Sequence, residues 1–317
     1  MGWRNVFNLF KLREKYTIPD NIDTLTDVPN KRHSLYAIKT DTKKNINQDA
    51  FEVFQHAESG TIIMALADGI GSSFFAEEGS KFVVEKAVDI LKEEFQEGRE
   101  IDYVDIFKRI QSGLTEMVKE KYYDQLTDIN DHDFGTTLIV GIDSPDVFTL
   151  AYIGNGCAYY IQGDITYFPN VNYMPWGVND LLTPHSLPNE VTGKDELCKY
   201  FCYRPTNVDQ VVPTVITISK NHYAGEIFVL ATDGLDSADK HDEFYYQDDN
   251  LYTKSSWSMS LFCRAIKDYL KTTSKIDDEG LSMVLDDYFN TLERENRMDD
   301  DTTIGIIVTS KVNRQLT

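Results

Sequence analysis

The amino-acid sequence predicts an α+β fold in which antiparallel sheets are covered by helices. The predicted elements come in the order strands, two helices, strands, two helices and a closing strand, which is not the βαβα alternation of a parallel sheet. The 317 residues are 41% apolar and 12% aromatic, so the chain can bury a core and is not a disordered one. Because no linker-like stretch divides the chain, we expect a single domain over residues 31–312, preceded by an N-terminal extension, residues 1–30.

The first half of that domain is predicted to begin with strands. Runs rich in β-branched and aromatic residues indicate strands at 34–40, 50–56 and 61–67. Apolar residues then recur at helical spacing in two stretches, 83–91 and 107–118. Strand patterns return four times, at 136–142, 147–153, 158–161 and 165–168.

The second half begins with an irregular segment. Residues 170–211 contain several Pro, Gly and Asn residues and are expected to form a long loop or a small subdomain, and such loops usually carry function. Strands are predicted at 212–219 and 227–232, and helices at 258–270 and 281–292. A closing strand is expected at 302–308.

Charge and hydropathy exclude several classes of protein. Lys and Arg number 31 and Asp and Glu 52, giving a net charge of −21. This charge argues against nucleic-acid binding and against docking on an anionic membrane, and it fits a protein that handles cations or basic partners. No apolar run approaches the ~18 residues of a transmembrane helix. Four cysteines without a disulfide or metal pattern indicate a reducing environment, so we expect a cytoplasmic protein.

The first 16 residues form an amphipathic stretch. Trp3, Val6 and Phe7 can share one helical face, whereas Arg4 and the other charged residues interrupt any secretory signal. This stretch either packs on the domain, docks a partner or lies on a membrane surface.

Carboxylates stand at the ends of several predicted strands. Asp68 and Asp233 each follow an apolar strand and precede a glycine, Asp49 precedes a strand, and residues 299–301 are three aspartates before the closing strand. Acids brought together in this way repel one another unless a cation lies between them, and hard divalent cations prefer oxygen ligands. The alternative for each Asp-Gly pair is an ordinary hairpin turn.

Six stretches resemble, in the same order, the motifs of metal-dependent serine/threonine protein phosphatases of type 2C. Residues 44–51 (KNINQDAF) are similar to the first motif, in which an Arg is followed by Asn, by Glu or Gln, and by Asp. Residues 67–72 (ADGIGS) resemble the Asp-Gly-x-Gly-Gly motif, and residues 134–137 (FGTT) the Gly-Ser/Thr-Thr strand. Residues 152–156 (YIGNG), 231–235 (ATDGL) and 300–304 (DDTTI) resemble the family's Val-Gly-Asp-Ser, Ser-Asp-Gly-Leu and closing Asp-Asn/Asp-x-Thr-Val motifs.

The resemblance implies a fold and a reaction. The fold would be two packed antiparallel sheets flanked by pairs of helices, a four-layer αββα sandwich, with a variable flap at about 170–211 that selects substrates. The reaction would be hydrolysis of phosphoserine and phosphothreonine on proteins by a water that two Mn²⁺ or Mg²⁺ ions activate, without a covalent intermediate.

The resemblance also implies roles for particular residues. Asp68 would bridge the two metal ions, and the carbonyl of Gly69 would bind one of them. Asp233 and Asp300 would complete the shell of the first ion, and Asp49 would hold metal-bound water on the other side. Lys44 stands where the family has the Arg that contacts the phosphate. A third ion, common in bacterial members, would be held by Asp131 or Asp133, with plain surface acids as the alternative.

The sequence departs from the family's pattern at four positions. Lys44 provides a point charge without the planar fork of Arg, so another cation such as Arg204 is a further candidate for the phosphate contact. Gln48 replaces Glu. Ile70 replaces the His of many eukaryotic members, which favours a bacterial-type protein. Asn155, in place of Asp, is interpreted as a local hydrogen-bond change.

Three other functions remain alternatives. The departures at residues 44, 48 and 155 favour a pseudophosphatase that acts as a regulatory or binding module. A phosphoesterase for small molecules would use the same metal pair. A nucleotide-binding module is disfavoured because the glycines at 69 and 71 do not form a phosphate-binding pattern.

Overall fold

The computed structural model describes residues 34–96, 101–163, 177–189, 193, 195–220, 225–237, 241–246, 251–273 and 276–309. These residues belong to one unit, Arg32–Thr317. The N-terminal extension, the docking stretch at 1–16, the strand predicted at 165–168 and part of the predicted flap lie outside the described residues. The predicted domain limits therefore stay predictions.

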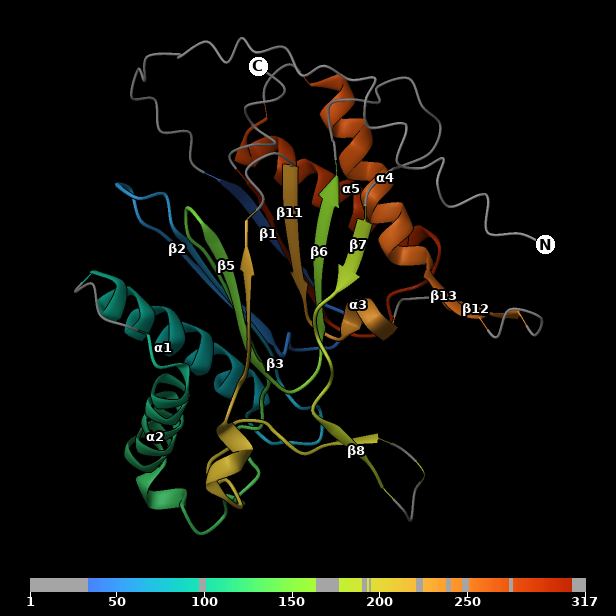
Figure 1. Ribbon diagram of the computed structural model, residues 1–317. Helices are drawn as coiled ribbons and strands as arrows, with labels where there is room; N and C mark the ends of the chain where they lie inside the picture. The colour runs from blue at the N-terminus through green and yellow to red at the C-terminus, as the bar shows by residue number, and fades with distance from the viewer. Residues whose placement is uncertain are drawn as a thin grey trace, which may run out of the picture. The chain divides into compact units, whose positions relative to one another are not determined.

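Two five-stranded sheets form the centre of the unit (Figure 1). The first sheet has the order β1 (Leu35–Asp41), β14 (Thr302–Val308), β11 (Gly225–Ala231), β6 (Cys157–Gly163) and β7 (Gly177–Asp180). The second has the order β10 (Thr214–Ser219), β5 (Val147–Ile153), β4 (Leu138–Asp143), β3 (Ile62–Asp68) and β2 (Asp49–Gln55). All their strand pairs are antiparallel, which confirms the predicted sheet type.

The two sheets pack face to face through apolar side chains. The ring of Phe148 on β5 stacks on that of Phe228 on β11, with centroids 3.8 Å apart and planes at 8°. Around this pair lie Met64 and Leu66 from β3 and Ile307 from β14, all buried. β3 and β14 are buried over almost their whole length, as expected of strands in the middle of a sandwich. They therefore provide rigid supports for the residues at their ends.

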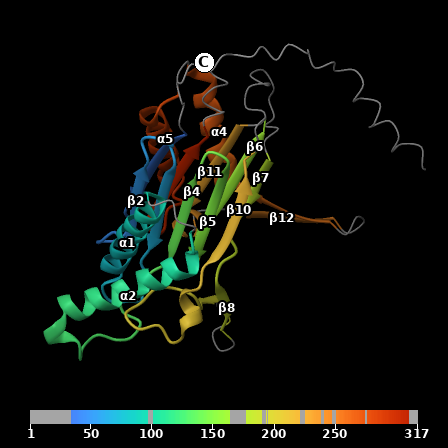
Figure 2. The same ribbon diagram turned by 60° about the vertical axis from the view of Figure 1, so that its left-hand side comes forward.

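A pair of helices covers the outer face of each sheet (Figure 2). α1 (Ala76–Gln96) and α2 (Tyr103–Lys121) share a buried cluster with the second sheet. α4 (Trp257–Thr272) and α5 (Asp278–Arg294) share another with the first sheet. These four layers confirm the αββα prediction. None of the described helices is long and apolar enough to span a membrane.

The helices extend beyond their predicted cores because polar caps add turns at their ends. The Asp102 carboxylate accepts hydrogen bonds from the N–H groups of Val104 and Asp105 at the start of α2. Asp277 accepts one from Gly280 at the start of α5. These caps lie outside the apolar repeat, so the periodicity alone placed the helix ends too far inward.

Several short elements were not predicted. The segment 170–211, expected to be irregular, contains β7, the hairpin of β8 (Ser186–Pro188) and β9 (Asp195–Leu197), and the 3₁₀ helix η3 (Val208–Val211). A second hairpin, β12 (His241–Tyr246) with β13 (Leu251–Ser256), follows α3 (Gly234–Ser237). The 3₁₀ helix η2 (Tyr123–Gln125) follows α2. Elements this short bury little apolar surface and leave almost no periodic signal in the sequence.

Candidate active site

Asp49 and Asp68 lie directly opposite each other on neighbouring strands. Asp49 begins β2, Asp68 ends β3, and the two are register partners in the antiparallel ladder. Residues opposite each other in such a pair point to the same face, with Cβ atoms about 5 Å apart. The ladder therefore places two of the predicted metal ligands side by side at one end of the second sheet.

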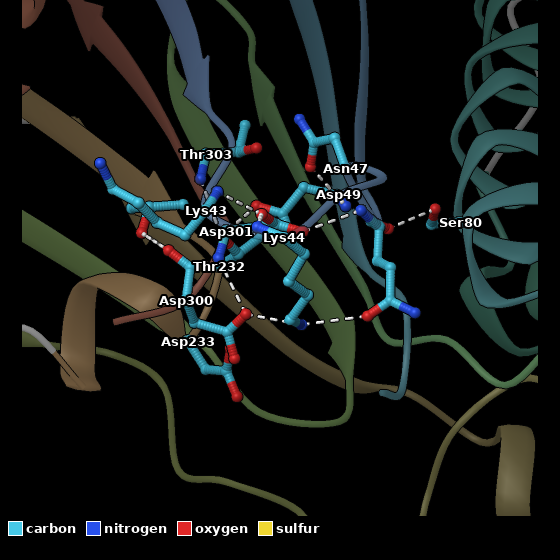
Figure 3. A network of polar contacts seen from close by, with 12 residues as sticks. Lys43, Lys44, Asn47, Asp49, Ser80, Thr232, Asp233, Asp300, Asp301 and Thr303 are labelled. Atoms are coloured by element: carbon cyan, nitrogen blue, oxygen red, sulfur yellow. Dashed lines mark hydrogen bonds and ion pairs between the residues drawn. The ribbon is translucent and has the colours of Figure 1, made fainter. Parts of the chain in front are cut away.

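The other two predicted acids come from the first sheet. Asp233 follows β11 and Asp300 precedes β14, and these strands pair antiparallel as far as Ala231 and Ile304. The four groups interact electrostatically. Besides burial, the charge of Asp233 raises the pKa of Asp68, and the charge of Asp300 raises the pKa of Asp233. Figure 3 shows Asp49, Asp233 and Asp300 in one polar network. The structure thus brings the four carboxylates together from both sheets.

Thr232 joins the two sheets at this point. Its hydroxyl donates a hydrogen bond of 2.7 Å to Oδ2 of Asp49 and accepts one of 2.8 Å from the N–H of Thr303. Because Thr232 and Thr303 are both fully buried, these bonds fix the Asp49 carboxylate against the first sheet. No role was predicted for Thr232 from the sequence. The signal that could have indicated one is its hydroxyl side chain directly before the pair Asp233-Gly234.

Burial shifts the pKa of these acids upward. Loss of solvent is the main cause for Asp49, whose pKa rises to about 6 despite hydrogen bonds from Thr232 and Thr303. Burial and then the charges of Asp233 and Asp49 hold the pKa of Asp68 well above its ordinary value. Burial also raises the pKa of Asp233. Carboxylates perturbed in this way, gathered at strand ends, are typical of functional sites.

The ammonium group of Lys44 lies among these acids. Its Nζ is 2.6 Å from Oδ1 of Asp300 and donates a hydrogen bond of 3.0 Å to Oε1 of Gln48. Its positive charge also lowers the pKa of both Asp68 and Asp233. Lys44 therefore neutralises part of the negative charge of the group, and its contact with phosphate stays a prediction.

Within the described part of the chain, two buried oxygen atoms at the site have no hydrogen-bond partner. They are Oδ1 of Asp49 and Oδ1 of Asn155. The other end of the Asn155 amide donates a bond of 2.7 Å to Oδ2 of Asp233, so this residue contacts one of the predicted metal ligands. An unpaired buried oxygen costs free energy, and hard cations bind such oxygens.

The donor set therefore fits a divalent cation, but its side chains are not arranged around one as they stand. Among the residues that the structure describes, no group of three or more His, Cys, Asp or Glu side chains is placed to hold a metal ion. One reason lies in Asp300, because its Oδ1 is already engaged by Lys44 and by the N–H of Asp301. Asp300 must release at least one of these partners before that oxygen can bind a metal.

Backbone contacts with two other segments of the chain fix the backbone of Gly69. Its N–H donates to the carbonyl of Gln48 at 3.0 Å, and it forms an isolated bridge with Thr136. A Cβ at this position would stand 2.9 Å from backbone atoms of Ala76, so only glycine fits. Thr136 and Thr137 also bond the carbonyl of Asp68, by the Thr136 hydroxyl at 2.8 Å and the Thr137 N–H at 2.9 Å.

The residues predicted for a third ion have protein partners. Asp131 pairs with Arg204 at 3.4 Å, and both side chains are exposed. Asp133 is buried and accepts a bond of 2.8 Å from the N–H of Asn130. Arg204, the further candidate for the phosphate contact, also packs over the ring of Tyr203. The third ion and its ligand stay predictions.

Comparison with known proteins shows which family and which solved structures the chain is similar to. Residues 40–174 match the family model described as protein phosphatase 2C. The structure resembles the Staphylococcus aureus serine/threonine phosphatase Stp1 (17% identity, TM-score 0.52), covering 86% of this chain and 94% of that one. It also resembles the Mycobacterium tuberculosis serine/threonine phosphatase PstP/Ppp (15%, TM-score 0.52), covering 87% and 99% of the two chains. At these identities the likeness shows a shared fold.

A sex-determining protein of C. elegans has the same fold, with 10% identity, a TM-score of 0.57, and coverage of 90% of this chain and 68% of that one. No curated protein sequence matches the chain. The family model covers the first four of the six motifs, and it agrees, together with the shared fold, with the resemblance drawn from the sequence.

Proposed function

We propose that this chain, a member of the protein phosphatase 2C family, hydrolyses phosphoserine and phosphothreonine on proteins. The observation that carries the proposal is the meeting of four strand-end carboxylates, Asp49, Asp68, Asp233 and Asp300, around the ammonium group of Lys44. Acids at this density need a cation, and a single lysine offsets only one of their charges.

Two Mn²⁺ or Mg²⁺ ions are the proposed cofactors. Asp49, Asp68, Asp233 and Asp300 would hold them together with the carbonyl of Gly69, and the unpaired Oδ1 of Asp49 supports this assignment. When bound, such ions activate a water molecule for attack on phosphorus and neutralise the phosphoryl oxygens. Asp131 or Asp133 remains the proposed ligand of a third ion.

Lys44 is proposed to bind the phosphate group. An ammonium is a compact charge that can attract a phosphate oxygen without bidentate geometry. Gly71 leaves space beside it, because a Cβ at Gly71 would lie 3.9 Å from Nζ of Lys44 and 3.7 Å from Oε1 of Gln48. A phosphate that approaches Lys44 from this side would pair with its ammonium in place of Asp300, which releases one of the two partners of Oδ1 of Asp300.

Two exposed apolar side chains support a protein substrate. Ile46 is 59% exposed and stands two residues after Lys44, and Phe74 is 68% exposed and stands three residues after Gly71. The backbone of Phe74 is held at both ends: its N–H donates to Asp133 at 3.4 Å, and its carbonyl accepts from Phe134 at 2.8 Å. Because these side chains are exposed and close in sequence to Lys44 and Gly71, they are proposed to contact a peptide next to the phosphorylated residue, a contact that a small phosphate ester would not make.

The second candidate function is a regulatory pseudophosphatase. The specific observation in its favour is the 2.6 Å ion pair between Lys44 and Asp300, an internal cation that satisfies one of the acids without a metal. The two functions differ in whether the site binds divalent cations.

Hydrolysis of p-nitrophenyl phosphate and of a phosphothreonine peptide, each with Mn²⁺ and with EDTA, tests the proposal. Metal-dependent release that Asp68→Asn abolishes is the expected result. Asp143→Asn is the matched control, because Asp143 is equally an aspartate of the second sheet but lies opposite Ile62, at the other end of β3. Absence of release from both substrates, with no Mn²⁺ binding by calorimetry, would favour the pseudophosphatase.

The cellular location is proposed to be the cytoplasm. All four cysteines lie among the described residues and none of them forms a disulfide, which supports a reducing compartment.

A further inference from the structure

Asp301 is a buried acid that binds backbone rather than other side chains. Its residue is 1% exposed, and its carboxylate accepts three backbone hydrogen bonds. Oδ1 accepts from the N–H of Lys43 at 2.7 Å and of Lys44 at 3.1 Å, and Oδ2 accepts from the N–H of Gln48 at 3.0 Å. Figure 3 shows Asp301 beside Lys43 and Lys44. All three donors belong to the loop that joins β1 to β2.

Among the residues that the structure describes, none pairs with this loop in a β-ladder. The β1–β14 pairing ends at Asp41 and Thr302, and the next residue on the β14 side is Asp301. From there the loop runs around the Asp301 carboxylate until β2 begins at Asp49. Hydrogen bonds to an ionised acceptor are stronger than neutral ones, so a single carboxylate can hold a loop that no strand supports.

Two consecutive residues, Asp300 and Asp301, bind the ammonium group and the backbone N–H of Lys44. The Asp301 carboxylate binds its backbone N–H, and the Asp300 carboxylate binds its ammonium group. The same Asp301 carboxylate binds the N–H of Gln48, whose side chain accepts from the Lys44 ammonium. The backbone at both residues of the Lys44–Gln48 contact is therefore fixed by one buried acid.

We infer that Asp301 is a positioning residue for phosphate binding. By holding the N–H groups of residues 43, 44 and 48, it keeps the Lys44 ammonium at the acidic site, where the phosphate of the substrate arrives. The inference rests on the proposed function for the phosphate role of Lys44, whereas the arrangement of the loop does not depend on it. Asp301 does not touch the substrate, so its effect passes through Lys44.

A double-mutant cycle tests whether Asp301 affects phosphate binding through Lys44. Inorganic phosphate is used as a competitive inhibitor of p-nitrophenyl phosphate hydrolysis by wild type, Asp301→Ala, Lys44→Ala and the double variant. We expect Asp301→Ala to raise the inhibition constant about tenfold, the worth of one charged hydrogen bond. In a protein that already carries Lys44→Ala, Asp301→Ala should change the inhibition constant less than about twofold, because the effects of residues that act through one another are not additive.

The result that overturns the inference is an equal effect of Asp301→Ala on both backgrounds, which would mean that Asp301 acts through Asp300 or through general stability. Asp143→Ala is the matched control for stability: Asp143 is similarly buried, at 2% exposed, and pairs with Lys220. It should lower the melting temperature without changing the inhibition constant. Asp301→Asn keeps one acceptor oxygen and should give an intermediate constant, which preserves the test if the alanine variant does not fold.

Hydrogen exchange tests the loop without any activity. In wild type, the amides of residues 43, 44 and 48 should exchange slowly within a peptide that spans residues 42–49. We expect Asp301→Ala to accelerate exchange in this peptide, and Asp143→Ala to leave it unchanged. Unchanged exchange in Asp301→Ala would overturn the inference whatever the activity is. If wild type hydrolyses neither substrate but exchange behaves as expected, the proposed function fails and the loop assignment stands.

Discussion

At the scale of single residues, charge balance decides the properties of the site. Asp49, Asp68 and Asp233 have raised pKa values because they are buried and lie near one another, and Lys44 opposes this effect at Asp68 and Asp233. Burying like charges without a counter-ion costs free energy, so the folded chain carries a strain that a bound cation would relieve.

Asp68→Asn should abolish turnover while the fold survives. The amide removes a charge that the proposed metals need, and we expect kcat to fall at least about a hundredfold, the scale of losing one electrostatic group at a reacting centre. Without metal, the same variant should have a higher free energy of unfolding than wild type, because repulsion from Asp49 and Asp233 is lost. Chemical denaturation in EDTA measures the second effect. Wild-type turnover in this variant would refute the role of Asp68.

Lys44→Arg should keep or improve phosphate binding. A guanidinium keeps the positive charge and adds a planar pair of donors that suits phosphate oxygens. We expect the KM for p-nitrophenyl phosphate to stay the same or to fall, and Lys44→Met, of similar length and without charge, to raise it. A large rise in KM for the arginine variant would show that Lys44 does not contact phosphate.

At the scale of elements, the site is built from the ends of β2, β3, β11 and β14 and from the loops after β1 and β3, and the strands provide rigidity. The loop after β3 turns at Gly69 and then enters α1 through Phe75, a residue with φ of +59°. The ring of Phe75 stacks on that of Phe134, with centroids 5.1 Å apart, which compensates for this uncommon backbone conformation. Phe74, one residue earlier, is thereby held outward in solvent.

Phe74→Ala should distinguish a peptide substrate from a small one. If the exposed ring contacts the peptide beside the phosphorylated residue, the variant should raise KM for the phosphothreonine peptide by about three- to tenfold, as loss of one apolar contact does. The KM for p-nitrophenyl phosphate should not change. Tyr123→Ala is the control, because Tyr123 is also exposed but belongs to η2 after α2. Equal effects of the two variants on the peptide would refute the contact.

At the scale of the whole molecule, the acidic site and the net charge of −21 act in the same direction. Ionisation of carboxyl groups destabilises the folded state in two ways. The acids that the two sheets bring together at the site repel one another, and so do the excess negative charges of the whole molecule. Stability of the metal-free protein should therefore depend on pH.

The free energy of unfolding of the metal-free protein should fall as pH rises from about 4 to 7. The pKa of Asp49 rises from 3.8 to about 6, so between these values the folded state binds more protons than the unfolded state, and stability decreases with pH. The contribution is on the order of 3 kcal/mol. Denaturation in EDTA across this range measures it, and Asp49→Asn should flatten the slope. If the unfolding free energy of Asp49→Asn changed with pH as steeply as that of wild type, the raised pKa of Asp49 would be contradicted.

Much of the site could be predicted from the sequence because its acids stand at the ends of apolar strands. β3 and β14 are runs of apolar residues that can be recognised without a structure, and Asp68 and Asp300 adjoin them. Asp301 was visible in the same acidic run, yet nothing in the sequence distinguishes an acid that binds backbone N–H groups from one that faces solvent. The short strands β7, β8 and β9 were missed because strands of three or four residues leave almost no periodic signal in the sequence.

The sequence by itself determined the α+β class, the order of the long elements and the four acids at strand ends, because these depend on local periodicity and on residue type. Only the tertiary structure decided that Thr232 holds Asp49, that Lys44 pairs with Asp300 and that Asp301 holds the loop between β1 and β2. Each of these contacts joins residues more than 180 positions apart in the chain or from different sheets. Such contacts are set by how the two sheets pack, and packing leaves no repeating pattern in the sequence.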